Sequence, residues 1–336
     1  MSLFRSRPLL FGCLTAALLA PLGVTVLAGT SSAATTITVA ADGSGNYTTI
    51  QAAIAAASSG TVISIKKGTY QGQVSIPAAK SSLTLQGATG TATDVVITGN
   101  TPQSASSASG SATVLNLAKN TAITGLTMRN TYGTGSQALA LYMGGDRQVY
   151  RNVRILGRQD TLLSWTGSTS SPIRQYIYKS YIEGDVDFIY GNGTVVIDSS
   201  TINSLDRGSS NNGYITAAAT NNGNPYGILI TRSTLTSSAA SQTVSLGRCW
   251  HPGGDTNASG QVLIRDSSIG GHIRQASAWM DMSGFSWKTC RFTEYNNTGS
   301  GKSNGTGDRP QMSATTAASY TSTKYLAGSD AWNPVQ

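Results

Sequence analysis

Short segments in which apolar and polar positions alternate recur along the middle of the chain. Most of them begin with a run that favours a β-strand, and all place Val or Ser two positions before a final aliphatic residue. AITGLTM (122–128) fits the pattern more weakly. The five clearest segments are VYRNVRI (149–155), YIYKSYI (176–182), VIDSSTI (196–202), LITRSTL (229–235) and LIRDSSI (263–269).

The spacing of these segments indicates the fold. From Met128 to Ile269, their last residues are separated by 27, 27, 20, 33 and 34 positions. Irregular repeats of this length, with turns rich in Gly, Ser and Asn, are typical of a parallel β-solenoid whose coils stack on one another. A β-sandwich is the alternative, but it needs antiparallel hairpins, and few two-residue Asn-Gly or Asp-Gly turns are present. We therefore predict an all-β fold, a parallel β-helix.

Two segments outside the repeat have patterns of their own. TIQAAIAAA (49–57) predicts a short N-terminal helix that caps the open end of the stack. TPQSASSASGSAT (101–113) is typical of a low-complexity surface loop.

The N-terminus resembles a targeting segment rather than part of the fold. Arg5 and Arg7 precede an apolar run over 9–27, and small residues follow it. This order is that of a secretory signal. A membrane span is the alternative, but Pro21 and Gly23 interrupt the run, and no charged residue closes it.

We therefore predict a signal peptide over 1–34 and a single β-helix catalytic domain over 35–336, secreted to the extracellular space. Removing the signal lowers the formal net charge from +8 to +6, because Arg5 and Arg7 are lost with it. Such a charge suits a polyanionic substrate, although an ordinary basic surface explains it equally well. Lysine clusters of the kind that bind nucleic acid are few.

The cysteines leave two interpretations open. Cys13 lies in the signal, so Cys249 and Cys290 remain, either as a disulfide or as two separate thiols. The only histidines are His251 and His272, and no Cys-x-x-Cys spacing is present. The sequence therefore predicts no structural zinc site.

Two aspartates stand out in a chain of which charged residues make up only 11%. Asp160 lies five residues after Ile155, and Asp187 lies five residues after Ile182, so both hold the same place in their coils. We expect the two carboxylates to lie side by side, where one holds its proton to higher pH than the other. Turn-forming aspartates are the structural alternative, but the residues that follow them, 161–163 and 188–190, are not turn formers.

Other polar residues lie in a position to assist this pair. Gln159 precedes Asp160, and Gln137 lies one coil earlier, so their amides are candidates for stabilising an oxyanion. Arg248 offers a planar fork to a carboxylate, and Trp250 offers an apolar face to a sugar.

Four motifs together resemble the pectin methylesterase (pectinesterase) family. They are QALAL (137–141), GRQDTLL (157–163), DFIYG (187–191) and LGRCW (246–250), and they stand in the family's order. The resemblance covers nearly the whole chain after the signal and also includes GNYTTIQAAI (45–54), FTEYNNTGSG (292–301) and YLAGSDAWNP (325–334).

The resemblance implies a right-handed parallel β-helix that hydrolyses methyl esters of polygalacturonate without metal or organic cofactor. Asp187 would be the nucleophile, and Asp160 would be the general acid and then the base. Gln137 and Gln159 would stabilise the oxyanion, and Arg248 would orient Asp187. The partner would be methylated homogalacturonan (pectin), with no nucleic acid and no membrane, and the protein would be a monomer. The expected substrate contacts are Gln137, Tyr190, Arg248, Trp250, Trp279 and Met282.

The sequence departs from the family's pattern in three places. Cys249 replaces a proline of the fourth motif, Tyr190 stands where Phe is common, and Arg158 stands where an aromatic residue is frequent. None of these changes removes a residue expected to be catalytic. Trp279 and Met282 resemble residues that line the substrate groove in bacterial members.

Three other functions fit parts of the sequence. A pectate or pectin lyase would use a similar solenoid with clustered acids for calcium, and Glu183, Asp185 and Asp187 resemble such a cluster. A non-catalytic glycan-binding β-helix would need neither aspartate. A serine esterase is suggested only by GKSNG (301–305), which lies in a polar loop without the buried strand that the nucleophile requires.

Overall fold

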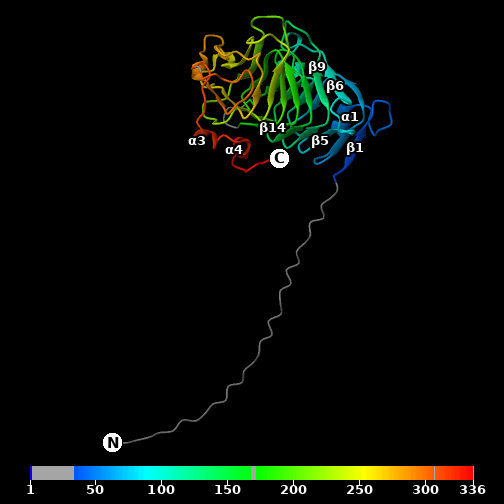
Figure 1. Ribbon diagram of the computed structural model, residues 1–336. Coiled ribbons are helices and arrows are strands. Elements are labelled where there is room, and N and C mark those ends of the chain that lie inside the picture. The colour runs from blue at the N-terminus through cyan, green and yellow to red at the C-terminus, as the bar shows by residue number, and fades with distance from the viewer. Residues whose placement is uncertain (2–33, 168–171, 306, 336) are drawn as a thin grey trace. The chain divides into compact units, whose positions relative to one another are not determined.

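The computed structural model describes residues 1, 34–167, 172–305 and 307–335. Residues Ala34–Gln336 form one compact unit. In this unit the chain winds through three parallel sheets in turn, coil after coil (Figure 1). The predicted signal peptide falls almost wholly outside the described residues. Within the described residues, no helix is long and apolar enough to cross a membrane.

The three sheets contain 10, 8 and 8 strands. Sheet 1 consists of β1 (Thr36–Val39), β2 (Val62–Ile65), β5 (Thr84–Gly87), β8 (Ala122–Thr124), β11 (Gln148–Arg151), β14 (Arg174–Tyr178), β17 (Thr194–Asp198), β20 (Ile228–Thr231), β23 (Gln261–Arg265) and β26 (Arg291–Tyr295). Sheet 2 consists of β3 (Gly68–Gln71), β6 (Val95–Gly99), β9 (Thr127–Asn130), β12 (Arg154–Leu156), β15 (Tyr181–Gly184), β18 (Thr201–Ser204), β21 (Thr234–Ser237) and β24 (Ser268–Ile269). Sheet 3 consists of β4 (Val74–Ile76), β7 (Val114–Asn116), β10 (Leu141–Met143), β13 (Leu162–Ser164), β16 (Val186–Gly191), β19 (Gly213–Ala218), β22 (Val244–Arg248) and β25 (Trp279–Met280).

The helices are short and lie outside the sheets. The α-helices are α1 (Ile50–Ala56), α2 (Ala108–Ser111), α3 (Ala314–Ala317) and α4 (Ser322–Ala327). The 3₁₀ helices are η1 (Gln103–Ala105), η2 (Pro252–Gly254) and η3 (Trp287–Thr289).

The predicted N-terminal helix is confirmed. Thr49 caps α1 by accepting a hydrogen bond from the backbone N–H of Ala52, at 3.2 Å. Ile50 and Ile54 are buried, and the helix packs against β1, β2 and β4 at the N-terminal end of the stack. The predicted loop over 101–113 is partly wrong, because η1 and α2 interrupt it.

The repeat predicted from the sequence corresponds to sheets 1 and 2 and the turn between them. The final aliphatic residues pair in register from coil to coil across sheet 2 and are buried. They are Met128, Ile155, Ile182, Ile202, Leu235 and Ile269. The predicted parallel stack is therefore confirmed, and unequal loops do not disturb it.

Each repeat turns from sheet 1 to sheet 2 at a residue with positive φ. The fourth position of the repeat has φ between 46° and 64° in every coil, as at Asn152, Lys179 and Arg232. Its backbone N–H donates to a carbonyl of the next coil, as from Asn152 to Tyr178 at 3.0 Å. A left-handed residue disfavours β-branched side chains, which accounts for the polar or glycine residue there.

The serine after this turn forms a ladder along the stack. The backbone N–H of each ladder residue donates to the hydroxyl of the serine one coil further on, from Val153 to Ser180 and onward to Ser267. Each hydroxyl in turn donates to the carbonyl two residues earlier, as from Ser233 to Thr231 at 2.8 Å. Each buried turn amide therefore has a partner, which explains why Ser recurs at this position.

The middle strands of sheet 1, β17, β20 and β23, are buried on both faces. Residues such as Ile177, Ile197 and Ile230 point into the core between the sheets. The alternate positions, including Val196 and Leu229, pack against a separate cluster formed with helix α4. The C-terminal segment thus covers the outside of this sheet, which explains its nearly continuous apolar runs.

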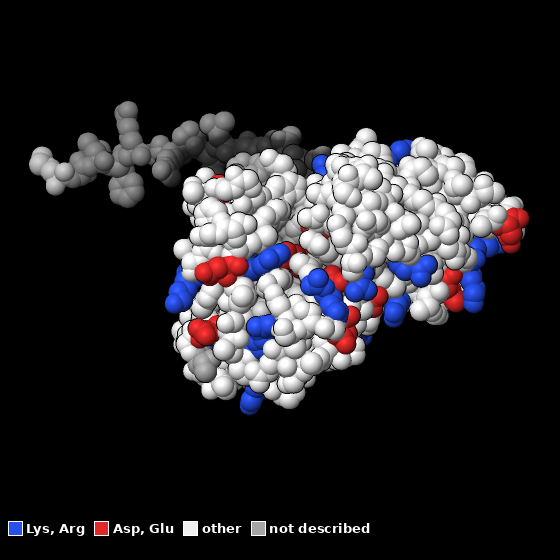
Figure 2. All heavy atoms as spheres, turned by 90° about the horizontal axis from the view of Figure 1, so that it is seen from above, with Lys and Arg blue, Asp and Glu red and all other residues white. Residues whose placement is uncertain are grey.

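Charged side chains are sparse on the surface. On the face shown in Figure 2, positive and negative groups lie close together in a mixed band, beside a broad area with few charges. That face has no large patch of a single sign.

The serine ladder predicts a stability cost that depends on a single hydroxyl. Ser233→Ala removes the acceptor of the Ser200 N–H. We expect the free energy of unfolding to fall by about 1–3 kcal/mol, the cost of one buried unpaired donor. Urea denaturation measures this change. Thr234→Ala, on an exposed neighbour in β21, is the matched control and should change stability by less than about 0.5 kcal/mol. Equal losses in the two variants would contradict the ladder's role.

Candidate active site

Two neighbouring coils of sheet 3 bring the two aspartates together. Asp160 lies just before β13, Asp187 lies in β16, and these strands pair in register from Leu162 and Ile189. The Asp160 N–H donates to the Val186 carbonyl at 3.0 Å. Both aspartates line one cavity of about 410 Å³. The structure thus brings the two aspartates to the same cavity.

The backbone at both aspartates departs from the regular strand. The φ angle is +63° at Asp160 and +49° at Asp187, and the pairing of β16 with β19 shifts its register between Val186 and Ile189. Asp tolerates the left-handed region better than most residues do. Irregular backbone of this kind occurs often at functional sites, where it directs a side chain that a regular strand would orient differently.

Arg248, the last residue of β22, holds Asp187. Its Nε donates to both carboxylate oxygens, at 2.9 and 3.2 Å, and Nη2 also donates to Oδ2. The guanidinium carbon lies 4.2 Å from the centroid of the Tyr214 ring. Asp187 is only 5% exposed, so a bidentate charged partner offsets its loss of hydration.

The residue before Arg248 has to be small. An added Cβ on Gly247 would lie 2.1 Å from the Thr216 hydroxyl and 3.2 Å from the Trp279 ring. Close packing therefore fixes the end of β22 and the direction of Arg248.

The two carboxyls differ in their electrostatic environment. Burial, and then the nearby Asp187 charge, raise the pKa of Asp160 to about 8, while the Tyr190 hydroxyl and the Arg248 charge oppose the rise. Burial also raises the pKa of Asp187, but Arg248 lies in direct contact and opposes this rise. Of the pair, Asp160 is therefore the carboxyl that holds a proton at neutral pH, and Asp187 is the one paired with a cation.

Two glutamines lie beside the pair on the cavity wall. Gln137 and Gln159 both line the cavity, and the Gln159 carbonyl accepts a hydrogen bond from the Ala138 N–H at 3.1 Å. Neither side-chain amide hydrogen-bonds another residue in the part of the chain that the structure describes. Both amides are thus free to bind a ligand.

Aromatic residues form the rest of the wall. Trp250 lies 5.5 Å from Trp165 and 5.6 Å from Tyr190, measured between ring centroids. Met282 also lines the cavity, as expected, and so does Tyr142.

One residue expected to bind substrate lies elsewhere. Trp279 was expected to line the cavity, but it is 1% exposed and packs on Phe292 in the core, with ring centroids 4.6 Å apart. The prediction was wrong because Trp279 belongs to β25 and points inward behind Gly247.

The sequence interpretation also missed several cavity residues. Gln103 and residues 107–109 belong to the segment interpreted as a plain surface loop, yet they line the cavity. Tyr142 and Tyr190 both pair with Leu163 in neighbouring coils. The register of these strands was therefore the signal that could have identified Tyr142 as a cavity residue. Trp165 lies five residues after Asp160, directly beyond β13.

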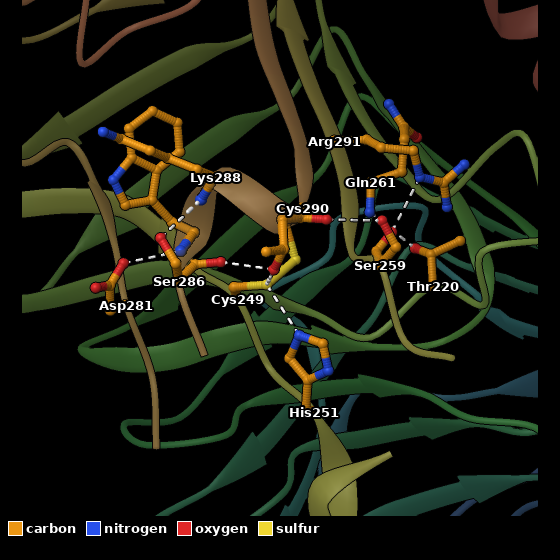
Figure 3. Close-up of a disulfide and its surroundings, with 12 residues drawn as sticks. Thr220, Cys249, His251, Ser259, Gln261, Asp281, Ser286, Lys288, Cys290 and Arg291 are labelled. Carbon is orange, nitrogen blue, oxygen red and sulfur yellow. Dashed lines mark hydrogen bonds between the residues drawn. A yellow bond between two sulfur atoms is a disulfide. The ribbon is translucent and has the colours of Figure 1, made fainter. Parts of the chain in front are cut away.

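Cys249 and Cys290 form a disulfide (Figure 3). Between Arg248 and Trp250, Cys249 is fully buried, and its backbone N–H donates to the Met280 carbonyl at 3.2 Å. The N–H that a proline at this position would lack is therefore satisfied. His251 Nε2 lies 3.3 Å from the Cys249 sulfur.

The disulfide joins the strand end that carries Arg248 to the loop that carries Met282. In that loop Met282 and Phe285 exchange backbone hydrogen bonds, and the Phe285 ring stacks on His251 at 3.8 Å. In the same loop, Asp281 accepts a hydrogen bond from the Trp287 N–H at 2.8 Å. Two walls of the cavity are thus covalently connected.

Comparisons with known proteins agree with this geometry. The family model "Pectinesterase" matches residues 36–329. A pectinesterase of Ralstonia solanacearum is 36% identical over 315 residues, 79% of this chain and 80% of the relative. A pectinesterase of Daucus carota is 32% identical, over 87% of this chain and 93% of the relative.

Solved structures of pectin methylesterases are also similar. The enzyme from Erwinia chrysanthemi superimposes with a TM-score of 0.79 at 28% identity, over 90% of this chain and 99% of that chain. An Asp-to-Ala variant of a pectin methylesterase in complex with a hexasaccharide gives 0.78 at 29% identity, over 91% and 100%. The predicted right-handed parallel β-helix is confirmed.

The disulfide predicts a stability that depends on the redox state. The bridge closes a separation of 41 residues, so its reduction should lower the free energy of unfolding by roughly 2–4 kcal/mol. Urea denaturation with and without dithiothreitol measures this, with thiol titration to establish reduction. The double variant Cys249→Ala/Cys290→Ala should have the same free energy of unfolding with and without dithiothreitol. Unchanged stability of the reduced wild type would contradict the prediction.

Proposed function

Since the chain belongs to the pectinesterase family of carboxylic ester hydrolases, we propose that it hydrolyses the methyl esters of galacturonate units in pectin. The products are methanol and pectate. Asp187 acts as the nucleophile, and Asp160 acts first as a general acid and then as a general base. The observation that carries this proposal is the buried pair itself, in which only Asp187 has an arginine in direct contact.

The first half-reaction forms a covalent intermediate. The Asp187 carboxylate attacks the ester carbonyl carbon, and the carbonyl electrons move to oxygen. The amides of Gln137 and Gln159 donate to this oxyanion. As the carbon–methoxide bond breaks, Asp160 gives its proton to the departing oxygen, and methanol leaves. An anhydride then links Asp187 to the galacturonate.

The second half-reaction restores the enzyme. Asp160, now a carboxylate, takes a proton from a water molecule that attacks the galacturonate carbonyl. Asp187 departs as a carboxylate, which its ion pair with Arg248 stabilises. The galacturonic acid product loses its proton to solvent, and Asp160 again holds a proton.

The cavity suits a sugar chain. Trp250 and Trp165 provide flat apolar faces, and Met282 provides a flexible apolar contact on the same wall. The hexasaccharide complex of a relative supports an oligosaccharide as the ligand. Methylated homogalacturonan fits because it carries both the esters and the sugar rings.

A lyase finds less support in the same residues. The acids that resembled a calcium cluster have partners of their own. Asp185 Oδ2 lies 3.0 Å from Arg158 Nε, and Glu183 accepts from the Tyr181 hydroxyl at 2.8 Å. Asp187 is bound to Arg248. Each acid thus binds a partner of its own within the protein, instead of sharing a calcium ion with the other two.

The remaining expectations form part of the same proposal. Residues 1–34 act as a secretory signal, and 35–336 form the secreted catalytic domain, which works as a monomer. No metal or organic cofactor takes part in the reaction.

Methanol release from methylated pectin tests the two aspartates. We expect Asp160→Ala to lower kcat by about 10²–10⁴-fold, the usual contribution of a general acid, and Asp187→Ala to lower it further. Asp206→Ala, on an exposed turn, is the control. Substantial turnover by a folded Asp187→Ala variant would refute the assigned nucleophile. An unsaturated product absorbing in the ultraviolet, or strict calcium dependence, would favour the lyase, and sugar binding without turnover would favour a glycan-binding module.

The protonation state of Asp160 predicts the pH above which activity falls. Because Asp160 must carry a proton to begin the reaction and its pKa is about 8, kcat/KM should fall as pH rises through 8. Initial rates between pH 5 and 10 measure this limb, with enzyme-free blanks for chemical de-esterification. Asp160→Asn should lose the limb along with most of its activity. A decline that begins well below pH 7 would contradict the assignment.

A further inference from the structure

Three side chains that can bind metal ions lie together at the disulfide. Cys249 follows Arg248 at the end of β22, His251 lies two residues further on, and Cys290 follows η3. The two sulfurs and a ring nitrogen of His251 all lie within 4.8 Å of one another. Among the residues that the structure describes, no other three Cys, His, Asp or Glu side chains converge in this way.

The His251 ring is held in the orientation that a metal ligand needs. Its Nδ1 lies 2.7 Å from the Asp255 carbonyl oxygen, which can only accept a hydrogen bond, so Nδ1 carries the proton in the neutral ring. The lone pair is therefore on Nε2, which lies 3.3 Å from the Cys249 sulfur (Figure 3). The Phe285 ring stacks on the imidazole. Histidines that bind metals are commonly fixed by such a second hydrogen bond.

We infer that reduction of the disulfide turns Cys249, His251 and Cys290 into a binding site for Zn²⁺ or a divalent cation of similar softness. A phosphine breaks the S–S bond, takes oxygen from water and leaves a proton on each sulfur. The cation then displaces both thiol protons to solvent and bonds to the two thiolates and to Nε2, with water as the fourth ligand. This site lies beyond the proposed function, because the cation takes no part in ester hydrolysis.

The distances fit such a site. Ligand atoms of a tetrahedral zinc ion with sulfur and nitrogen ligands lie about 3.5–3.8 Å apart. The Cys249 sulfur and His251 Nε2 already lie near this separation. The Cα atoms of the two cysteines are 5.9 Å apart, so rotation about the Cα–Cβ bonds is enough to separate the reduced sulfurs.

Charge and burial favour the same ion. A divalent cation with two thiolates and a neutral imidazole has no net charge, so its burial avoids the cost of an unpaired charge. Cys249 is fully buried and His251 is 9% exposed. Cys290 is partly exposed, which gives the ion a path to the site.

The sequence expectation of no structural zinc site depended on the absence of Cys-x-x-Cys spacing. The fold supplies the ligands instead from two segments, and the cysteines are 41 positions apart. A bound ion would join the end of β22 to the loop of Met282, as the disulfide does.

Cobalt(II) is the probe, because its spectrum reports both the ligands and the geometry. The full chain, reduced with a phosphine in the absence of oxygen, should bind one equivalent of Co²⁺. Thiolate-to-cobalt charge-transfer bands and the visible bands of a tetrahedral ion should appear, and Zn²⁺ should abolish them. His251→Phe keeps a ring against Phe285 and should weaken binding at least about 100-fold, the upper end of the loss caused by removing an outer-shell partner.

Two controls test whether binding needs both thiols. Wild type with the disulfide intact should give no thiolate–cobalt bands. The reduced variant Cys249→Ala/Cys290→Ala should also give none, and because it retains Cys13 and His251 it shows whether those residues alone bind the ion.

Urea denaturation covers the case in which reduction loosens the fold. Zn²⁺ should raise the urea midpoint of reduced wild type and leave that of reduced His251→Phe unchanged. Absence of cobalt bands in reduced wild type overturns the inference, and so does equal affinity in His251→Phe or in the double alanine variant. A reduced wild type that stays unfolded in excess Zn²⁺ overturns it as well. None of these measurements depends on methanol release, so a failure here leaves the proposed function standing.

Discussion

The in-register stacking of parallel coils is the constraint on which the rest of the molecule depends. Sheet hydrogen bonds join each coil only to its two neighbours, so a residue's position within its coil decides which residues it meets. Ile155 and Ile182 pair in sheet 2, and five residues later Asp160 and Asp187 reach one cavity from sheet 3. The arrangement of the two aspartates follows from this regularity with local departures, a positive φ at both residues and a register shift of β16 beside Asp187.

Burial makes both carboxyls of the aspartate pair sensitive to their neighbours, and an ionic contact distinguishes one from the other. Neither carboxyl is well hydrated, so each is sensitive to the nearest donor or cation. Arg248 reaches Asp187 with two nitrogens, while Asp160 has no ion-pair partner among the described residues. An arginine bound to only one of them therefore separates two chemically identical groups, and close packing at Gly247 directs the arginine.

The sequence was sufficient to predict the repeat and the pair of aspartates, because both depend on position within the coil. It was insufficient wherever the direction of a side chain decided the outcome. Trp279 adjoins a cavity strand, yet it faces the core, and a short two-residue strand carries no alternation from which its direction follows. The segment 101–113 has the composition of a loop, but its two short helical turns bring Gln103 to the cavity. The pairing of Cys249 with Cys290 required coordinates, since 41 positions of chain say nothing about proximity.

The serine ladder has a consequence for how such a chain can change over time. Each hydrogen bond of the ladder joins two adjacent coils. It forms whatever the length of chain between them, which varies from 20 to 34 residues among the repeats. Insertions that lengthen a connecting loop therefore leave every hydrogen bond of the ladder intact. Loops around the cavity are free to diversify in length and composition, so the lining of the cavity can change without altering the column of hydroxyls that joins the coils.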